Sequence, residues 1–296
     1  MRSLRLGSRG SRLALIQSQS VAARLEQVGC RVELVVIATA GDRRRPDEEL
    51  GEGIFVGAIE VALGAQEIDL AVHSAKDLPM AGTPGLVVGA YPERGDPRDA
   101  LVSAGGGTTL AGLRVGAEIG TDSPRRRAFL LRQRPDLRLV PCAGNVDTRL
   151  GRLNSGSPEA AILAAAGLDR LGQGGRADQR LDPEIMPPAP AQGALAVQCR
   201  AQDDELTALL AGLDQRAVRL AVVAERAVLA ELDAGCSSPV GALAHVDADT
   251  LFLVAAAIGE GGAHSVRLRG PASLESAEEL GRTAARSLAE RAGLIR

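Results

Sequence analysis

Alternation of apolar strand-like stretches with helical stretches is the feature that most constrains the fold of this chain. RVELVVIA (31–38) and IDLAVHS (68–74) have the near-continuous apolar character of strands buried on both faces of a sheet. Helical periodicity covers 11–27 before the first strand and lies near 55–65 before the second. This alternation predicts a parallel α/β sheet.

Two polar, proline-containing breaks divide the chain, at YPERGDPRD (91–99) and MPPAPAQG (186–193). A second run of strands and helices lies between them, and the last 80 or so residues combine alternating antiparallel-type strands with an amphipathic helix. We therefore predict the α/β class, with two lobes and a small α+β C-terminal domain. The predicted boundaries are 1–93 plus 194–212 for lobe 1, 98–187 for lobe 2, and 216–296 for the C-terminal domain. Two lobes joined by linkers predict a ligand in a cleft between them.

Composition excludes several classes of function. The net charge is -3 and the pI about 5.8, so no overall basic field exists for nucleic acid. No apolar run is long enough to span a bilayer, and the first ten residues lack the apolar core of a signal peptide, so we expect a cytoplasmic protein with no membrane partner. Four cysteines without CxxC spacing and three histidines make a metal site or a disulfide framework unexpected.

The stretch AVHSAKDLP (71–79) contains Lys76, the only lysine of the chain. Lysine offers a compact ammonium group, whereas arginine is a planar fork. Together with Ser8, the side chains of Ser74, Lys76 and Asp77 fall at the carboxyl ends of predicted strands, where ligands bind in α/β sheets. Chance survival of one lysine, or a turn stabilised by polar side chains, is the alternative interpretation.

A second cluster lies in GTDSPRRRAFLLR, where Thr121 and Ser123 precede a helix that begins with arginines 125–127. A helix N-terminus with nearby guanidinium groups suits a carboxylate or a phosphate. Successive helical residues point about 100° apart, so at least one of the three arginines is expected on a solvated face. Arg149 and Arg170 follow in the same predicted lobe. Aromatic residues are 1% of the chain, so a site built on stacking is not expected.

Cys236 lies in the glycine-containing stretch LDAGCSSPVG after a long predicted helix. A buried small hydrophobe is the usual role of a free cysteine, but a loop favours an exposed and reactive thiol. A thiol, an acid and an arginine cluster together suggest covalent handling of a polyanion.

Several stretches in a fixed order carry a resemblance. They are LGSRGSRLALIQ, AVHSAKDLP, GDPRDALVS, IGTDSPRR, GNVDTRLGRL, AAAGLDRLG, PAPAQGALAVQCR and AERAV followed by GCSSPVG. Through them the chain resembles the porphobilinogen deaminase (hydroxymethylbilane synthase) family along nearly its whole length.

The resemblance implies a transferase that condenses four porphobilinogen molecules head to tail into hydroxymethylbilane, with release of ammonia. It implies two lobes like those of periplasmic binding proteins and a third domain. It also implies a dipyrromethane cofactor joined to Cys236 by a thioether, with Asp77 as the catalytic carboxylate. A monomer that passes its product to the next pathway enzyme is the expected form.

Further site residues follow by position in the matching motifs. The resemblance implies that the cofactor is bound by Ser74, Lys76, Thr121, Ser123, Arg125, Arg126 and Asp42. It implies that the substrate is bound by Arg9, Ser11, Gln17, Arg149, Arg170 and Gln192.

Three positions depart from the family pattern, because Glu52 and Gly57 stand where the family has lysine and Ala143 where it has arginine. Each lost charged contact should cost on the order of 1.5 to 3 kcal/mol. We hypothesise that arginines 43–45 restore the charge. An active enzyme is the leading hypothesis, and a divergent copy that binds pyrroles or small polycarboxylates without turnover is the alternative. A two-lobed solute receptor fits poorly, since it would have no use for the cysteine loop.

Overall fold

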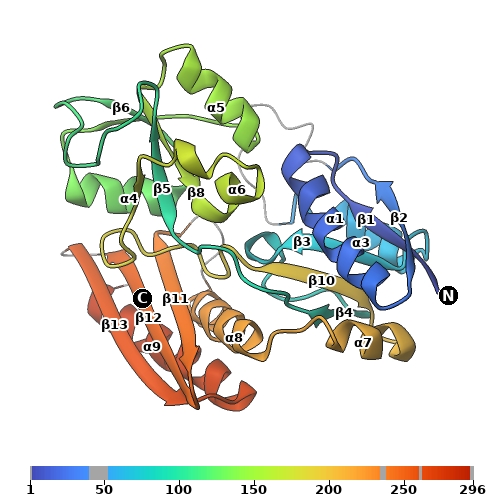
Figure 1. The fold of residues 1–296 in the computed structure, drawn as a ribbon. Helices are drawn as coiled ribbons and strands as arrows, with labels where there is room; N and C mark the ends of the chain where they lie inside the picture. Colours follow the sequence, from blue (N-terminus) through green and yellow to red (C-terminus); the bar gives the residue numbers. More distant parts are fainter. Residues whose placement is uncertain (1, 40–52, 234–237, 260–261, 294–296) are drawn as a thin grey trace. The chain divides into compact units, whose positions relative to one another are not determined.

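The computed structural model describes residues 2–39, 53–233, 238–259 and 262–293. The chain divides into two compact units, which we describe one at a time. Unit 1 contains Met1–Arg94 and Ala194–Arg219, and unit 2 contains Gly95–Gly193 and Leu220–Arg296. Figure 1 shows the elements along the chain. None of the helices in the described ranges combines the length and the apolar character that a membrane crossing requires.

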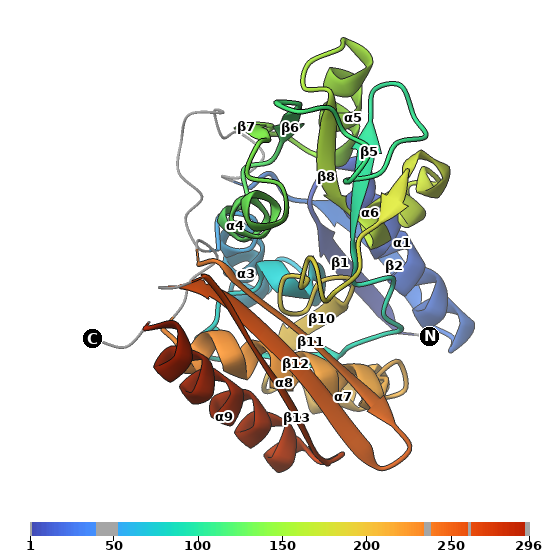
Figure 2. The same cartoon turned by 90° about the vertical axis from the view of Figure 1, so that its left-hand side faces the viewer.

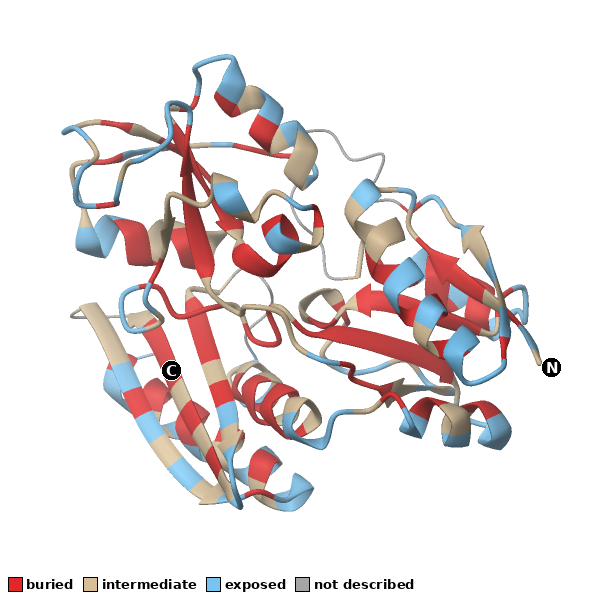
Figure 3. Cartoon of the chain, viewed as in Figure 1, coloured by how far each residue is buried: buried red, intermediate tan, exposed pale blue. Residues whose placement is uncertain are grey.

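Unit 1 is built on a five-stranded sheet in the order β2-β1-β3-β10-β4. β1 is parallel to β2 and to β3, whereas β10 is antiparallel to β3 and to β4. The elements of this unit are β1 (Ser3–Ser8), α1 (Arg12–Gln27), β2 (Arg31–Val36), α3 (Gly57–Gly64), β3 (Leu70–Ser74), the 3-10 turn η1 (Ala75–Asp77), β4 (Leu86–Ala90), β10 (Leu195–Arg200) and α7 (Asp204–Ala211). β3 and β10 form the buried centre of the sheet (Figure 3).

The edge position of β2 corrects one expectation. The segment 31–38 was expected to be buried on both faces, but β2 stands at the end of the strand order and Val36 is 58% exposed. An apolar run records local composition only, so it does not distinguish a central strand from an edge strand. The expectation of a parallel sheet also needs correction, because β10 enters the sheet in the opposite direction.

Unit 2 contains a second five-stranded sheet with the same pattern of directions, in the order β7-β6-β8-β5-β9. β6 is parallel to β7 and to β8, and β5 is antiparallel to β8 and to β9. Its elements are β5 (Asp99–Ser103), β6 (Glu118–Gly120), α4 (Pro124–Gln133), β7 (Arg138–Val140), α5 (Val146–Asn154), β8 (Ala160–Ala164), α6 (Ala165–Arg170), the 3-10 turn η2 (Gly174–Arg176) and β9 (Gln179–Arg180). In each sheet, one strand runs antiparallel to both of its neighbours, β10 in unit 1 and β5 in unit 2. This strand is the first one that the chain forms after it crosses from the other unit.

The C-terminal part of unit 2 is a small antiparallel sheet with two helices. The sheet has the order β11-β12-β13, and its elements are β11 (Val240–Asp247), β12 (Thr250–Gly259), β13 (Gly262–Pro271) and α9 (Leu274–Ala292). α8 (Arg216–Glu231) begins in unit 1 and continues into unit 2. Figure 2 shows α9 running along this sheet.

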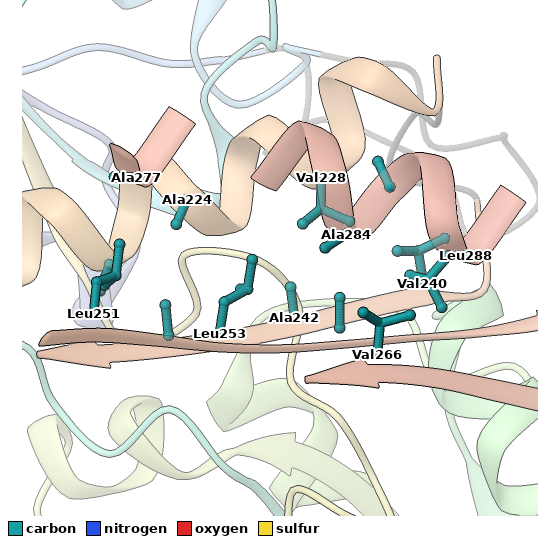
Figure 4. Packing of buried hydrophobic residues seen from close by; sticks show 14 of the residues in the cluster. Ala224, Val228, Val240, Ala242, Leu251, Leu253, Val266, Ala277, Ala284 and Leu288 are labelled. Carbon is teal, nitrogen blue, oxygen red and sulfur yellow. The ribbon is translucent and has the colours of Figure 1, made fainter. Parts of the chain in front are cut away.

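Both helices pack small apolar side chains against one face of that sheet. Figure 4 shows Ala224 and Val228 of α8 beside Ala284 and Leu288 of α9, above the strands. A Cβ atom on Gly281 would lie 2.4 Å from the carbonyl oxygen of Ala224. The close approach of α8 and α9 therefore requires glycine at this position.

The predicted fold class is confirmed, with two parallel-rich α/β sheets and a small C-terminal part. Ala256 and Ile258 of β12 join the hydrophobic cluster under the β5–β9 sheet, which includes Leu101 and Ile119. This shared core explains why the C-terminal part belongs to unit 2. The division into three domains stays a prediction.

Candidate functional site

The carboxyl ends of β1 and β3 form one edge of the sheet in unit 1. These neighbouring strands are parallel and end at Ser8 and Ser74. α1 begins at the same edge, because only three residues separate β1 from it, and the Ser11 side chain caps it by accepting from the backbone N–H of Ala14 at 3.3 Å. The Gln17 side chain, buried in α1, donates to Ser74 Oγ at 3.4 Å. Three predicted site residues, Ser11, Gln17 and Ser74, are thus brought together.

Asp77 follows β3 directly, in the turn η1. A hydrogen bond of 3.0 Å from the backbone N–H of Ala75 to the carbonyl oxygen of Ala194 holds this turn in place. The Asp77 carboxyl is half-buried, and its burial raises its pKa, while the nearby charges of Lys76 and Arg9 lower it. Lys76 and Arg9 therefore lie within electrostatic reach of Asp77.

Arg9 stacks on an aromatic ring. Its guanidinium carbon lies 4.1 Å from the centre of the Phe55 ring, and Phe55 precedes α3. A cation–π contact of this kind holds the guanidinium plane without using up its N–H donors. Phe55 was not among the predicted site residues.

In unit 2 three predicted site residues converge on Asp99, a residue that the sequence did not single out. Arg125 Nη2 donates to one carboxylate oxygen at 2.8 Å, and Arg126 Nη2 donates to the other at 2.7 Å. Gln192 Nε2 donates to Asp99 Oδ1 at 2.9 Å. Asp99 is fully buried and both arginines are at most 5% exposed. One carboxylate balances two guanidinium groups, which leaves one positive charge in excess.

The electrostatics of Asp99 follow from these partners. Burial alone would raise the pKa of Asp99, but the charges of Arg125 and Arg126 and the hydrogen bond from Gln192 more than offset it and hold the pKa well below its usual range. The only hint in the sequence was an aspartate at the start of the strand DALVS, and such residues usually cap turns. Partners from 125, 126 and 192 come together only in the folded chain.

Arg149 and Arg170 lie in the same unit and make few contacts. Arg149 Nε donates to the carbonyl oxygen of Gly144 at 2.9 Å, and Arg170 Nη2 donates to that of Gly193 at 2.6 Å. Burial lowers the pKa of both guanidinium groups, and for Arg149 the neighbouring charge of Arg126 lowers it further. A bound anion would therefore stabilise the guanidinium cations of Arg149 and Arg170.

The remaining predicted residues of this unit cap the start of α4. Ser123 Oγ accepts from the backbone N–H of Arg126 at 3.4 Å, and Thr121 Oγ1 accepts from that of Ser123 at 3.2 Å. Thr121 is fully buried. Of the three successive arginines, Arg127 is the one that does not reach Asp99, and its Nη1 donates to the carbonyl oxygen of Leu139 at 3.4 Å.

Some expectations fall outside the described residues. They are the cofactor cysteine Cys236, Asp42, the departure Glu52 and the compensating arginines 43–45. Of the other two departures, Gly57 is exposed at the start of α3, and Ala143 is buried. Cys30, Cys142 and Cys199 are buried, and no group of metal-binding side chains occurs among the described residues.

A buried polar chain lies in the sheet of unit 1, behind the Asp77 edge. Gln198 Nε2 donates to Glu60 Oε1 at 2.8 Å, so Gln198 Oε1 is the acceptor for His73 Nε2, 3.1 Å away. Thr83 Oγ1 donates to the second Glu60 oxygen at 2.7 Å. The chain of hydrogen bonds links β3, β10 and α3, so it helps to hold the strand that leads into the turn with Asp77.

The His73 imidazole should make unit 1 less stable in mild acid. Burial lowers its pKa to about 4, despite the opposing effects of Glu60 and Gln198. An unfolded histidine binds its proton near pH 6.5, so the unfolded chain takes up more protons between pH 6.5 and 4 and stability falls as the pH drops through this window. From pH 7 to pH 5 the loss due to His73 should be about 2 kcal/mol.

Urea unfolding at pH 7 and at pH 5 measures this loss. The His73→Gln chain keeps a donor toward Gln198 and should lose about 2 kcal/mol less than the unsubstituted chain between the two pH values. Equal losses of stability in the two chains would show that His73 does not cause this pH dependence.

The chain matches two family models and is similar to relatives whose names are known. The family model of the porphobilinogen deaminase dipyrromethane cofactor binding domain matches residues 4–208, and the model of the porphobilinogen deaminase C-terminal domain matches 219–290. The porphobilinogen deaminase of Acidothermus cellulolyticus is 50% identical over 292 residues, which cover 96% of this chain and 88% of that protein. That of Mycobacterium tuberculosis is 47% identical over 297 residues, covering 97% and 96%.

Among solved structures, the periplasmic aliphatic sulphonate binding protein SsuA from Escherichia coli aligns with a TM-score of 0.42 and 18% identity, covering 79% of this chain and 71% of that one. The matches to the two family models together span nearly all of the chain, and the relatives align over nearly its full length. The chain therefore belongs to the porphobilinogen deaminase family.

Proposed function

We propose that Asp77 is the catalytic carboxylate of this enzyme, a transferase that joins four porphobilinogen molecules into the linear tetrapyrrole hydroxymethylbilane and releases ammonia. The single observation that carries the assignment is the position of Asp77, half-buried at the carboxyl end of β3 and within electrostatic reach of Arg9 and Lys76. The alternative of a divergent non-catalytic copy is not favoured, since relatives of about 50% identity are porphobilinogen deaminases.

The chemistry calls for a carboxylate at this place. When the C–N bond of the aminomethyl group breaks, the nitrogen leaves as ammonia and the substrate becomes an azafulvenium cation, with its charge spread to the pyrrole nitrogen. The Asp77 carboxylate stabilises that cation through the pyrrole N–H. A new C–C bond then forms between the cation and a pyrrole carbon of the growing chain. Asp77 accepts the proton which that carbon releases.

Dipyrromethane is the cofactor of this family, and the side chains of unit 2 fit it. Pyrroles of this pathway carry an acetate and a propionate, so their binding requires cationic N–H donors. The two terminal nitrogens of Arg149 donate no hydrogen bond within the described part of the chain, and the side chain is 23% exposed, so these donors are accessible to a carboxylate. When bound, dipyrromethane supplies the pyrrole carbon to which the first substrate unit is joined.

We propose that the cofactor is attached to Cys236 and held by Ser74, Lys76, Thr121, Ser123, Arg125, Arg126 and Asp42. Arg9, Ser11, Gln17, Arg149, Arg170 and Gln192 are the proposed substrate-binding residues. The role of Arg125 and Arg126 is supported by the excess positive charge around Asp99. Because both arginines are buried against Asp99, we propose that they act on the cofactor mainly through this charge.

Three further proposals concern the chain as a whole. Residues 1–93 plus 194–212, 98–187 and 216–296 form three domains, a division supported by the separate family model for the C-terminal domain and by the hydrophobic cluster between α8, α9 and β11–β13. The enzyme works as a monomer in the cytoplasm and passes its product to the next enzyme of the pathway. A net charge of -3 supports the absence of a nucleic-acid partner.

Intact-mass measurement tests the proposed function. The purified chain should be heavier than its sequence by two linked pyrrole units, and Cys236→Ser should abolish the increase, because the thioether needs the thiol sulfur. Cys30→Ser is the matched control and should keep the increase. An unmodified mass that persists after incubation with porphobilinogen and hydroxymethylbilane would overturn the proposal.

A further inference from the structure

Asp122 is a carboxylate within the arginine-rich site of unit 2. It lies between β6 and α4, in the stretch GTDSP, and its side chain is 14% exposed. Its Oδ1 accepts from the backbone N–H of Cys142 at 3.0 Å. Its Oδ2 is buried and has no hydrogen-bond partner among the described residues. Ser123, not Asp122, caps α4.

The charge that faces this free oxygen is Arg149. Its Nη2 lies 4.0 Å from Asp122 Oδ2, too far for a hydrogen bond. The contact of Oδ1 with Cys142 restrains the carboxylate from moving closer. Burial and the like charges of Arg126 and Arg152 disfavour the Arg149 cation, and Asp122 opposes them. Arg149 is thus stabilised by a carboxylate that leaves its terminal N–H donors open.

An anionic ligand that reaches those donors meets Asp122 as well. Two carboxylates at one guanidinium group repel each other, so the resident carboxylate lowers the affinity of Arg149 for the incoming one. A strong hold would be a disadvantage here, because the bound chain gains a pyrrole with two carboxylates in each round and has to advance past the same arginines.

We propose that Asp122 acts through Arg149 to weaken the hold of the enzyme on the carboxylates of the growing pyrrole chain, which allows the chain to advance. This inference rests on the proposed function. The substitution Asp122→Asn separates the effect of the charge from that of the hydrogen bond to Cys142. The side-chain oxygen still accepts from the Cys142 N–H, while the negative charge is gone.

Equilibrium binding of porphobilinogen tests the proposal apart from turnover. Four chains are compared by calorimetry, and all of them carry Asp77→Asn so that turnover does not interfere. The first has no further change, the second also carries Asp122→Asn, the third carries Arg149→Gln instead, and the fourth carries both of these substitutions. Asp122→Asn should lower the Kd about threefold. In the Arg149→Gln background the same substitution should have no effect, because its partner is gone. Asp136→Asn, which removes a charge paired with Arg134 at the far end of α4, is the control and should leave the Kd unchanged.

Turnover gives a second readout, in chains with Asp77 intact. Asp122→Asn should lower KM and kcat together, and a larger share of the resting enzyme should carry extra pyrrole units by intact mass. An unchanged or higher Kd, or a tightening that persists with Arg149→Gln, overturns the role of Asp122. Absence of turnover by the unsubstituted chain overturns the proposed function instead, and the binding series still decides the inference. If none of the four chains binds porphobilinogen, both the proposed function and the role of Asp122 are contradicted.

Discussion

Replacing Asp77 by asparagine should lower kcat for porphobilinogen consumption by about a hundredfold to ten-thousandfold. Asparagine has nearly the same shape, but it carries no charge to stabilise a pyrrole cation and accepts no proton at the pH of the reaction. KM should change much less, because the arginines and serines proposed to bind the substrate remain. Asp77→Glu, with its carboxylate displaced by one methylene group, should retain a part of the activity.

Steady-state kinetics with ammonia release as the readout measure this effect. Glu93→Gln is the matched control, since the Glu93 side chain is 80% exposed and pairs only with Arg24 at 3.5 Å among the described residues. Its kcat should equal that of the unsubstituted chain. An Asp77→Asn enzyme with more than about a third of the normal kcat would rule out catalysis by this carboxylate.

The pH profile provides a further check on Asp77. Burial raises its pKa, so the carboxylate form is lost at a higher pH than the ordinary aspartate value near 3.9. The acid limb of the kcat profile should accordingly lie above that value and should be absent from the residual activity of Asp77→Asn.

Replacing Asp99 by alanine should destabilise unit 2 by about 3 to 5 kcal/mol. The substitution leaves Arg125 and Arg126 buried side by side without their carboxylate, and removes one of the acceptors of Gln192. Two unpaired like charges in a buried site are among the largest single-residue costs in a folded protein. Activity should fall as well, because the arginines would no longer be held in place.

Chemical unfolding at pH 7 measures the loss of stability. Asp136→Asn is the matched control, because Asp136 also receives two donors from one arginine, Arg134, but at a partly exposed position. Its cost should be much smaller, because solvent screens an ion pair at a partly exposed position. A cost for Asp99→Ala as small as that of the control would show that the cluster does not stabilise the fold.

Acid unfolding should also show how much Asp99 contributes to the stability of the fold. Its pKa is lower in the folded than in the unfolded chain, so the stability that it contributes is present above the unfolded value near 3.9 and is lost as the pH falls below that value toward the folded pKa. The chain with Asp99→Ala should lack this part of the pH dependence.

Local features of the site could be predicted from the sequence because they depend on neighbouring residues. Ser11 and Ser123 are N-caps where the helical patterns begin, and Ser74 and Asp77 follow a buried strand. Capping, strand burial and the turn after a strand are set within a few residues of chain, so periodicity and residue type were enough to place these groups at the sheet edge.

The partners of each charge could not be predicted, because they come from distant parts of the chain. Asp99 meets residues 26, 27 and 93 positions away, and β10 enters the first sheet 121 residues after β3 ends, in the opposite direction. Similarly, Asp122 approaches Arg149, which lies 27 positions further along the chain. The sequence by itself determined the helices, the strands and the residue types at their ends. Only the tertiary structure decided which carboxylate faces which arginine, since these contacts depend on strand order and on burial, and no local pattern encodes either.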